Sequence, residues 1–540
     1  MPASLDLRFD RFYSYQELTR ALEQLAAFAP DRVRRHSIGR SPEGRELWML
    51  TVTDFTRGDP DRKPAYLIHG NLHAQELSGT TAALYVAHYL VTDDTPELQR
   101  LLGEVVFYIV PRINPDGAEY ALTTGGAIRS RLVPVPARNA IRPADVNGDG
   151  LILRMRIRCE DGDQRPDRQD PRLMVPREPH DDEGPFYRVF TEGFIEDWDG
   201  GEPREASYHK DFNRNWGANW RPEHQQYGAG DFPFSEPEMR AVAEFVAAHP
   251  NIFGALGFHT GCNGVLRPPA SRPDEELNDR DLAVLRELGR KGEQATGFKL
   301  RAVTQYRLDE SRPNRLQGHF TDWAYEHLGI YPFEIELGML YQSAGITTDQ
   351  YFASKSDEER REFDRAILRW HDAHPEAGAF VDWQPFEHPQ LGRVEIGGLR
   401  MNAFANPDPR ELPGIAEGCT RFILEHAGRY PHLRIVGVRV DAVGSDIFRI
   451  RATVMNTGGF PTYIAETGRD VRANRSPMAR LELGDGMEML SREAGVELGR
   501  LGARSGKRDL EWFVKGRGTA RLVASAVKAG TAAVEIPIGG

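Results

Sequence analysis

The 540-residue chain has little of three things that would assign it to a specialised class. It has only three cysteines, Cys159, Cys262 and Cys419, which form no CxxC pair and no disulfide framework, so a reducing compartment is compatible. Lys and Arg number 68 against 80 Asp and Glu, a formal net charge of −12, which argues against a nucleic-acid partner. No apolar run is long enough to span a membrane, and no basic segment with an apolar run opens the chain. We therefore expect no signal peptide, no membrane association and a cytoplasmic protein.

Strands alternating with helices dominate the first 430 residues. Capping boxes at Ser14–Glu17 and Ser235–Glu238 predict two helix starts. Apolar strands are expected at 33–38, 46–52, 65–68, 105–110, 252–258 and 331–337, and helices at 17–28, 78–91, 238–246, 321–327 and 414–427. This alternation predicts an α/β fold with a mixed, mostly parallel central sheet and helices on both faces.

Two segments depart from that pattern. Residues 138–207 are charged, rich in Pro and Gly and weakly periodic, which indicates a long ordered insertion or lid outside the central sheet. After His432, short strands expected at 433–440, 447–455, 510–514 and 520–525 predict a β-sandwich. The expected domains are 1–430 and 431–540. If their interface is modest, the first should fold without the second.

Two side chains of zinc-ligand type stand three residues apart where a strand turns into a helix. These are His73 and Glu76, and a helix start would put them on one face, so that both could bind one ion. A second HxxE, His180 to Glu183, lies in an acidic, Pro-flanked stretch that we interpret as a solvated loop. The first copy alone has a context that would fix its geometry.

A catalytic zinc needs a third protein ligand and an open position for water. His259 follows the strand 252–258, and open α/β sheets place their sites at the carboxyl ends of strands. Cys262, three residues further on, is the weaker candidate. Zinc lowers the pKa of bound water to about 7, and a carboxylate must then move the proton. Glu334 and Glu336 share one face of the strand 331–337 and are the candidates.

Together these segments resemble the zinc metallocarboxypeptidases of the carboxypeptidase A type, over residues from about Phe9 to Ala427. The matching motifs, in the same order, are Leu72-His-Ala-Gln-Glu76, Asn114-Pro-Asp-Gly117, Phe212-Asn-Arg-Asn-Trp216, Phe232-Pro-Phe-Ser-Glu236, Gly257-Phe-His259, Asp322-Trp-Ala-Tyr325 and Phe333-Glu-Ile-Glu-Leu337. The resemblance implies His73, Glu76 and His259 as zinc ligands. It implies Glu336 as the general base, with Glu334 in a supporting position.

The same resemblance assigns three side chains to the substrate. Asn213 and Arg214 match the pair that grips a terminal carboxylate, for which a guanidinium fork is suited. Arg129 matches the arginine that polarises the scissile carbonyl and stabilises the oxyanion, and Arg131 is the alternative.

The chain departs from the family before the Asp322 motif. The segment from Tyr306 to Phe320 is longer than usual, and Tyr306 is the only tyrosine available for the family's mobile active-site tyrosine. Thr321 matches a position that often lines the specificity pocket. An acidic residue there would favour Lys or Arg, and it is absent.

The insertion contains a pattern typical of calcium loops. Asp145, Asn147 and Asp149 alternate and are followed by Gly150, which resembles the first half of an EF-hand loop. The twelfth position is Arg156 rather than Glu, so a complete EF-hand is excluded. Calcium and a simple Asx-rich turn both remain open.

The leading hypothesis is a zinc metallocarboxypeptidase that hydrolyses the C-terminal peptide bond of peptides with a free carboxylate, using metal-activated water and a Glu general base. One alternative keeps the site but changes the bond: a deglutamylase-like amidohydrolase or deacylase that acts on a carboxylate-bearing amide and releases a side-chain glutamate or an N-acyl group. Another is a non-catalytic protein whose β-sandwich binds a protein or a glycan.

Overall fold

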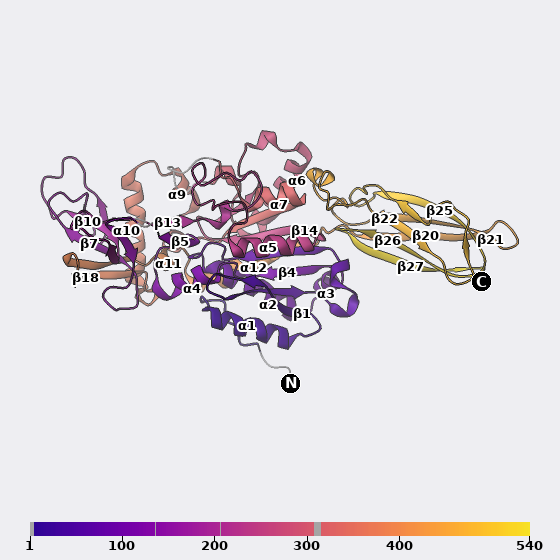
Figure 1. Cartoon of the computed structure of the whole chain (residues 1–540), viewed down its shortest axis with the longest axis horizontal. Helices are drawn as coiled ribbons and strands as arrows, with labels where there is room; N and C mark the ends of the chain where they lie inside the picture. The colour runs from indigo at the N-terminus through magenta and orange to yellow at the C-terminus, as the bar shows by residue number, and fades with distance from the viewer. Residues whose placement is uncertain (1–4, 135–136, 206, 307–314, 540) are drawn as a thin grey trace.

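The computed structural model describes residues 5–134, 137–205, 207–306 and 315–539, and Figure 1 shows a central α/β domain with smaller β-rich parts at either end. The central sheet has the strand order β1-β2-β4-β3-β14-β17-β15-β16. These strands are β1 (Val33–Arg40), β2 (Glu46–Val52), β3 (Ala65–Gly70), β4 (Val106–Val110), β14 (Ile252–His259), β15 (Gly264–Arg267), β16 (Leu300–Ala302) and β17 (Tyr331–Glu336). The pairs β3–β4, β3–β14, β14–β17 and β15–β16 are parallel and the other three are antiparallel, so the sheet is mixed and mostly parallel, as predicted.

The α-helices of the described residues are α1 (Tyr15–Phe28), α2 (Ser78–Thr92), α3 (Pro96–Glu104), α4 (Pro115–Thr124), α5 (Pro237–Ala248), α6 (Asp279–Thr296), α7 (Phe320–Leu328), α8 (Leu340–Ser343), α9 (Thr348–Ala353), α10 (Asp357–Ala373), α11 (Met401–Phe404) and α12 (Leu412–Ala427). Among these, α1, α2, α5, α6, α7 and α12 pack against strands of the central sheet. Every residue of β3, β4 and β14 is buried, as expected for a sheet with both faces covered. α12 packs against α2 and α6 and closes the domain.

One of the two predicted capping boxes is present. Ser14 caps α1 and exchanges hydrogen bonds with Glu17, as expected. The second prediction is wrong in detail: α5 forms, but Glu236 is its N-cap and makes no side-chain capping bond. Glu238 instead binds the Arg131 guanidinium at 2.6 Å. A partly buried guanidinium competes for the carboxylate more strongly than a backbone N–H group does.

The insertion is ordered and lies outside the central sheet, as predicted, but it contains more strands than expected. Its strands are β6 (Ala140–Pro143), β7 (Arg154–Arg158), β8 (Gln164–Pro166), β9 (Met174–Pro176), β10 (Tyr187–Thr191), β11 (Gly193–Glu196) and β12 (Arg204–Glu205), and it is flanked by the paired strands β5 (Arg131–Pro134) and β13 (Ser207–Lys210). Four of them join β18 (Phe380–His388) and β19 (Gly392–Leu399) in a six-stranded sheet with the order β18-β19-β7-β10-β8-β9. The late hairpin therefore completes a module that begins more than 200 residues earlier.

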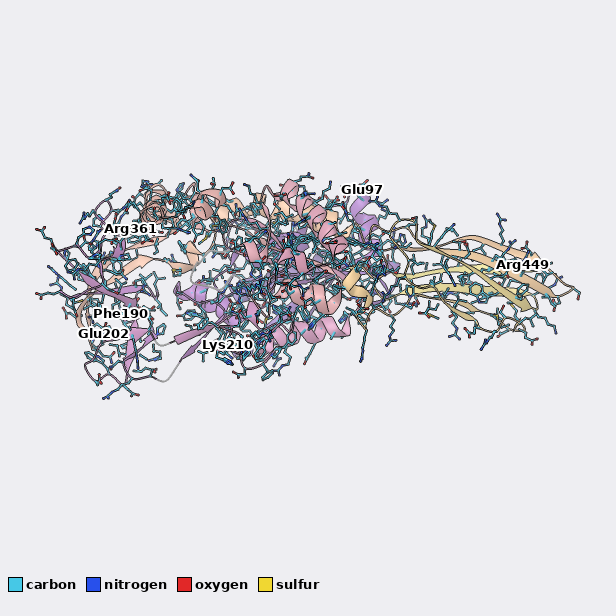
Figure 2. The ribbon with its side chains drawn as sticks, turned by 90° about the horizontal axis from the view of Figure 1, so that it is seen from above. Glu97, Phe190, Glu202, Lys210, Arg361 and Arg449 are labelled. Atoms are coloured by element: carbon cyan, nitrogen blue, oxygen red, sulfur yellow. The ribbon has the colours of Figure 1, made fainter. Side chains whose placement is uncertain are left out.

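An ion pair fastens α10 to this module. Arg365 of α10 binds Asp167 through two hydrogen bonds of 2.7 and 2.8 Å, and both residues are buried. In Figure 2, Phe190 and Arg361 lie at one end of the molecule and Arg449 at the other. The module is thus at the end opposite to the C-terminal β-domain.

The C-terminal part is a sandwich of two antiparallel four-stranded sheets, as predicted. One sheet contains β20 (Leu433–Ala442), β21 (Ile447–Asn456), β25 (Lys507–Lys515) and β23 (Glu488–Met489). The other contains β24 (Gly495–Glu497), β22 (Met478–Glu482), β26 (Gly518–Ala526) and β27 (Gly530–Ile538). Alternate residues point into a shared core around Trp512, which is fully buried.

The sandwich is joined to the central domain through buried groups, which changes the expectation of an independent catalytic domain. Phe460, Ile464 and Ala465 belong to the core of the central domain. Asp281 of α6, also fully buried, accepts hydrogen bonds from the backbone N–H groups of Glu466 and Thr467. Removing the sandwich would therefore expose part of the central core.

A lysine makes a second connection at the far side of the interface. Lys528, in the turn between β26 and β27, is 3% exposed and donates to the carbonyl oxygens of Pro250 and Ile252 at 3.1 and 2.6 Å. Burial lowers the pKa of Lys528 to about 7. These carbonyls lie at the start of β14, the end opposite to His259.

We expect Lys528→Met to destabilise the protein by about 1–3 kcal/mol, because the buried Ile252 carbonyl and the partly buried Pro250 carbonyl lose their donor. The check is the free energy of unfolding in denaturant, with Lys515→Met, an exposed lysine of the same domain, as the control. Equal stability of wild type and Lys528→Met would show that this contact does not hold the domains together.

Candidate metal centre

His73, Glu76 and His259 converge at the carboxyl ends of two neighbouring parallel strands. His73 and Glu76 follow β3, and His259 is the last residue of β14. Each offers a ligand atom, and these atoms all lie within 4.8 Å of one another. The Nδ1 atoms of the two histidines are 3.0 Å apart, and Glu76 oxygens lie 2.8 and 3.0 Å from them. The sequence therefore located a three-residue cluster that is buried.

One local expectation is corrected. His73 and Glu76 are not on the first turn of α2, which begins at Ser78. They lie in the preceding turn, where the Glu76 N–H group donates to the His73 carbonyl at 3.3 Å. This turn keeps residues i and i+3 together without a helix.

The donor set fits a zinc ion. Two imidazole nitrogens and one carboxylate are the ligands of many catalytic zinc sites. Each histidine turns Nδ1 to the cluster and Nε2 to a carboxylate: His73 Nε2 is 3.1 Å from Asp211, and His259 Nε2 is 3.1 Å from Glu334. This pairing fixes the ring orientation and the tautomer that a metal requires.

Asp211 is a residue of the site that the sequence analysis missed. It accepts hydrogen bonds from Arg129 Nε at 3.0 Å and from the Asn213 N–H group at 2.9 Å. Burial alone would raise the pKa of Asp211, but Arg129, Arg214 and His73 outweigh it and hold the pKa well below its ordinary value. The available signal was its position directly before the Phe212-Asn-Arg motif.

Glu336 lies directly beside His259 in the paired strands β14 and β17. Its Oε2 atom is buried and has no hydrogen-bond partner among the described residues. Burial raises the pKa of Glu336 to about 8; His259 opposes the rise and Glu76 adds to it. A carboxyl group with such a pKa can both accept and release a proton near neutral pH.

The structure separates the two arginine candidates. Arg129 Nη1 lies 3.0 Å from Glu76, so its guanidinium is next to the cluster. Arg131 turns away to the start of α5, where it binds Glu236 and Glu238. The geometry thus brings Arg129, and not Arg131, to the candidate centre.

Asn213 and Arg214 are both buried near the cluster, but their surroundings differ. The Asn213 amide donates to Glu334 at 3.0 Å and accepts from the Phe320 N–H group at 2.9 Å. Arg214 lies 3.6 Å from Asp211 and lines a cavity of about 630 Å³ that Arg129 and Asp211 also line. Residues 223–227 form another wall of this cavity. Arg214 faces this space, whereas Asn213 faces the interior.

Tyr306 and Thr321 occupy less direct positions. The Tyr306 hydroxyl donates to the Cys262 carbonyl at 2.7 Å, and residues 307–314, which follow it, lie outside the described residues. Thr321 is fully buried, and its hydroxyl is 3.0 Å from His319 Nδ1. Burial lowers the pKa of His319 to about 3, so its imidazole is neutral. Their assignment to substrate binding stays a prediction.

The calcium-like loop forms an Asx-rich turn. Asp145 accepts from the N–H groups of Gly148 and Gly150 at 2.7 and 2.9 Å, and Asp149 accepts from Leu151 and from the side chain of Asn147. These oxygens bond within the loop itself, and calcium binding stays a prediction.

Two lesser metal candidates lie apart from the cluster. His180 and Glu183 are exposed in a loop, as predicted for the second HxxE copy. The Cys262 thiol is buried and lies 3.5 Å from the Gln342 amide. Burial raises the pKa of this thiol to about 12, which disfavours the thiolate that a metal would need.

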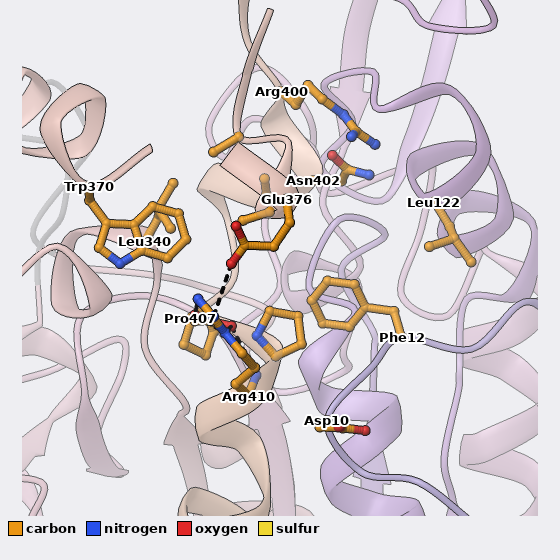
Figure 3. A pocket seen from close by; sticks show the side chains of 15 residues that line it. Asp10, Phe12, Leu122, Leu340, Trp370, Glu376, Arg400, Asn402, Pro407 and Arg410 are labelled. Atoms are coloured by element: carbon orange, nitrogen blue, oxygen red, sulfur yellow. Dashed lines mark hydrogen bonds and ion pairs between the residues drawn. The ribbon is translucent and has the colours of Figure 1, made fainter. Parts of the chain in front are cut away.

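A second cavity, of about 340 Å³, lies between the N-terminal segment, α4 and α10 (Figure 3). Its walls include Phe12, Leu122 and Trp370, and an ion pair of 3.0 Å joins Glu376 to Arg410 at its side. None of the predicted site residues lines it. The cavity next to the cluster is the one beside Arg129, whose lining residues Arg129 and Asp211 contact Glu76 and His73.

Comparison with known proteins agrees with this site. Residues 18–360, more than half of the chain, match the model of the family described as zinc carboxypeptidase. The chain belongs to the zinc carboxypeptidase family. Residues 432–537 match a domain of unknown function. Within the described residues, no helix combines the length and apolar character needed to cross a bilayer.

Individual relatives share limited parts of the chain. Carboxypeptidase Z of Homo sapiens is 33% identical over 130 residues, which are 23% of this chain and 20% of that protein. A zinc carboxypeptidase of Saccharothrix mutabilis subsp. capreolus is 33% identical over 117 residues, 21% of this chain and 26% of that protein. The chain thus matches between about a fifth and a quarter of the length of these two curated relatives.

Solved structures match over longer stretches. Carboxypeptidase A from Helicoverpa armigera has a TM-score of 0.42 and 19% identity, and the match covers 70% of this chain and 78% of that one. Thrombin activatable fibrinolysis inhibitor has a TM-score of 0.42 and 16% identity, with 78% and 75% covered.

The purified protein should contain about one zinc ion per chain, since three ligands leave one position open in a catalytic site. Elemental analysis should show that His73→Ala loses this zinc. His180→Ala, in the exposed second HxxE copy, is the control and should keep it. Full zinc occupancy in His73→Ala would refute the assignment of the ligands.

Proposed function

We propose that this chain is a zinc-dependent metallocarboxypeptidase that hydrolyses the C-terminal bond of peptides with a free carboxylate. The observation that carries the proposal is the cluster of His73, Glu76 and His259 with Arg129 and Glu336 beside it. Zinc held there would polarise a carbonyl group and activate water. Family membership supports the same reaction class.

The chain's own residues divide the remaining work. Glu336, placed beside His259 with one buried oxygen free among the described residues, accepts the proton of the attacking water and gives it to the leaving amine. Arg129 has its guanidinium next to the cluster and stabilises the oxyanion. Its contacts with Glu76 and Asp211 keep it in place before the substrate arrives.

Arg214 binds the terminal carboxylate of the substrate and so orients the peptide. It lines the cavity beside the cluster and, as a guanidinium, can bind a carboxylate through two parallel hydrogen bonds. Arg129 and Asp211 line the same cavity and contact Glu76 and His73 of the cluster, so a bond near the terminal carboxylate would be the one cleaved. A deacylase that acts on a carboxylate-bearing amide could use the same contact, and the comparison of peptide substrates below separates the two activities.

Glu336→Gln should keep its zinc and lose turnover by roughly 10²–10⁴-fold, the scale of general acid–base catalysis. Steady-state kinetics on metal-saturated protein measures this, and Glu417→Gln on the exposed side of α12 is the matched control. A mild loss in Glu336→Gln would move the proton transfer to another group.

Arg214→Ala should reduce kcat/KM for free-acid peptides, at a cost of about 2–5 kcal/mol, because a desolvated carboxylate loses its partner. Amidated peptides should be poor substrates for the wild type and lose little more in the mutant. Arg214→Lys should recover only part of the activity, since it lacks the planar fork.

The measurement is kcat/KM for matched free-acid and amide peptides, with Arg221→Ala as an exposed arginine control. Cleavage of both peptides at equal rates by the wild type would contradict the carboxypeptidase proposal and favour the deacylase alternative. No cleavage of any peptide or amide by zinc-loaded protein would favour the binding-protein alternative.

A further inference from the structure

Glu334 is a buried carboxylate of the centre that the proposed reaction does not use. It lies two residues before Glu336 on β17, and only 1% of it is exposed. Its Oε1 atom is 3.1 Å from His259 Nε2 and 3.0 Å from the Asn213 amide. Its Oε2 atom is 3.5 Å from His319 Nε2. Three side chains from three elements therefore converge on this group.

The Asn213 side chain is joined to interior groups of the centre. Its Oδ1 atom accepts the Phe320 N–H group, and its Nδ2 atom donates to Glu334 at 3.0 Å. The Thr321 N–H group donates to His319 Nδ1, so the neutral His319 ring carries its proton on Nε2, the atom that lies 3.5 Å from Glu334. Asn213 and His319 therefore both present N–H donors to Glu334.

We propose that Glu334 is the positioning residue for His259, and that Asn213 and His319 hold Glu334 in place. The inference rests on the proposed zinc centre. A carboxylate on Nε2 fixes the tautomer that leaves Nδ1 free to bind a metal, sets the plane of the ring and increases its basicity. Losing such a partner typically weakens metal binding by about 10–100-fold.

The strand pairing explains why Glu334 can reach that nitrogen. Gly257 pairs with Glu334, and His259 pairs with Glu336, in the parallel ladder of β14 and β17. A Cβ atom on Gly257 would lie 3.3 Å from Glu334 Cγ and 2.5 Å from the ring of His69. Glycine at 257 therefore leaves the space in which Glu334 lies beside β14.

The carboxylates that contact the two histidine rings, Asp211 and Glu334, differ in their other partners. Asp211, on His73, binds Arg129 as well, so changing it would disturb the substrate side. Among the described residues, Glu334 contacts interior groups only. Glu334 is thus the position at which the effect on the metal can be measured apart from substrate binding.

The test compares zinc affinity in wild type, Glu334→Gln and Glu336→Gln by competition with a chromophoric chelator. Glu334→Gln keeps the size of the side chain and removes its charge, and it should bind zinc about 10–100-fold more weakly. Glu336→Gln, on the same strand, should bind zinc as the wild type does. The visible absorption spectrum of the cobalt(II)-substituted protein should change in Glu334→Gln because the orientation of His259 changes.

Asn213→Ala tests whether this amide holds Glu334 in place. It should weaken zinc binding and alter the cobalt spectrum in the direction of Glu334→Gln. Equal unfolding midpoints of metal-free wild type and Asn213→Ala show that the fold is retained. If the midpoints differ, Asn219→Ala, a change at an exposed asparagine, serves as the control.

Unchanged zinc affinity and an unchanged cobalt spectrum in Glu334→Gln would overturn the inference. So would an Asn213→Ala variant that affects only KM for free-acid peptides. Because zinc affinity is measured without substrate, a zinc-binding wild type that cleaves no peptide would refute the proposed function and still decide the part played by Glu334.

Discussion

The burial of several charges around two histidines is the constraint on which the centre depends. Glu76, Asp211 and Glu334 are almost completely buried, and a buried carboxylate is costly unless charged or hydrogen-bonding partners surround it. Arg129 forms ion pairs with both Glu76 and Asp211. The Nε2 atoms of His73 and His259 contact Asp211 and Glu334, respectively. These charged groups surround one point, where the two histidine Nδ1 atoms and the Glu76 carboxylate meet. A divalent cation at that point would bring further positive charge to the buried carboxylates.

The central sheet places these residues close to one another. Parallel pairing of β3, β14 and β17 brings three strand ends to one edge, and the two-residue pleat puts Glu334 and Glu336 on the face that carries His259. Because the sheet interior is rigid and buried, these side chains have little freedom to move apart. The far end of β14 is held by Lys528 from the C-terminal sandwich, so that domain stabilises a strand of the site without contributing a ligand.

Much of this could be predicted from local patterns. The strands before His73 and His259 are short apolar runs, and their order along the chain, together with spaced motifs, located the three clustered residues and Glu336 beside them. Asp211 was missed because its partners Arg129 and His73 are distant in sequence, and its position before the Phe212-Asn-Arg motif does not report those contacts. The inward orientation of Asn213 was missed for the same reason, since it depends on Glu334 and His319. The hairpin β18–β19 was not predicted, because its partner strand β7 lies more than 200 residues earlier in the sequence.

X-ray absorption at the zinc K edge of the purified protein tests the central claim most directly. The account predicts a first coordination sphere of nitrogen and oxygen atoms at about 2.0–2.2 Å, with the outer-ring scattering of two imidazoles. Any zinc that His259→Ala still holds at saturating metal should show a single imidazole. A sulfur ligand at about 2.3 Å, or a zinc environment without imidazole, would contradict the centre formed by His73, Glu76 and His259.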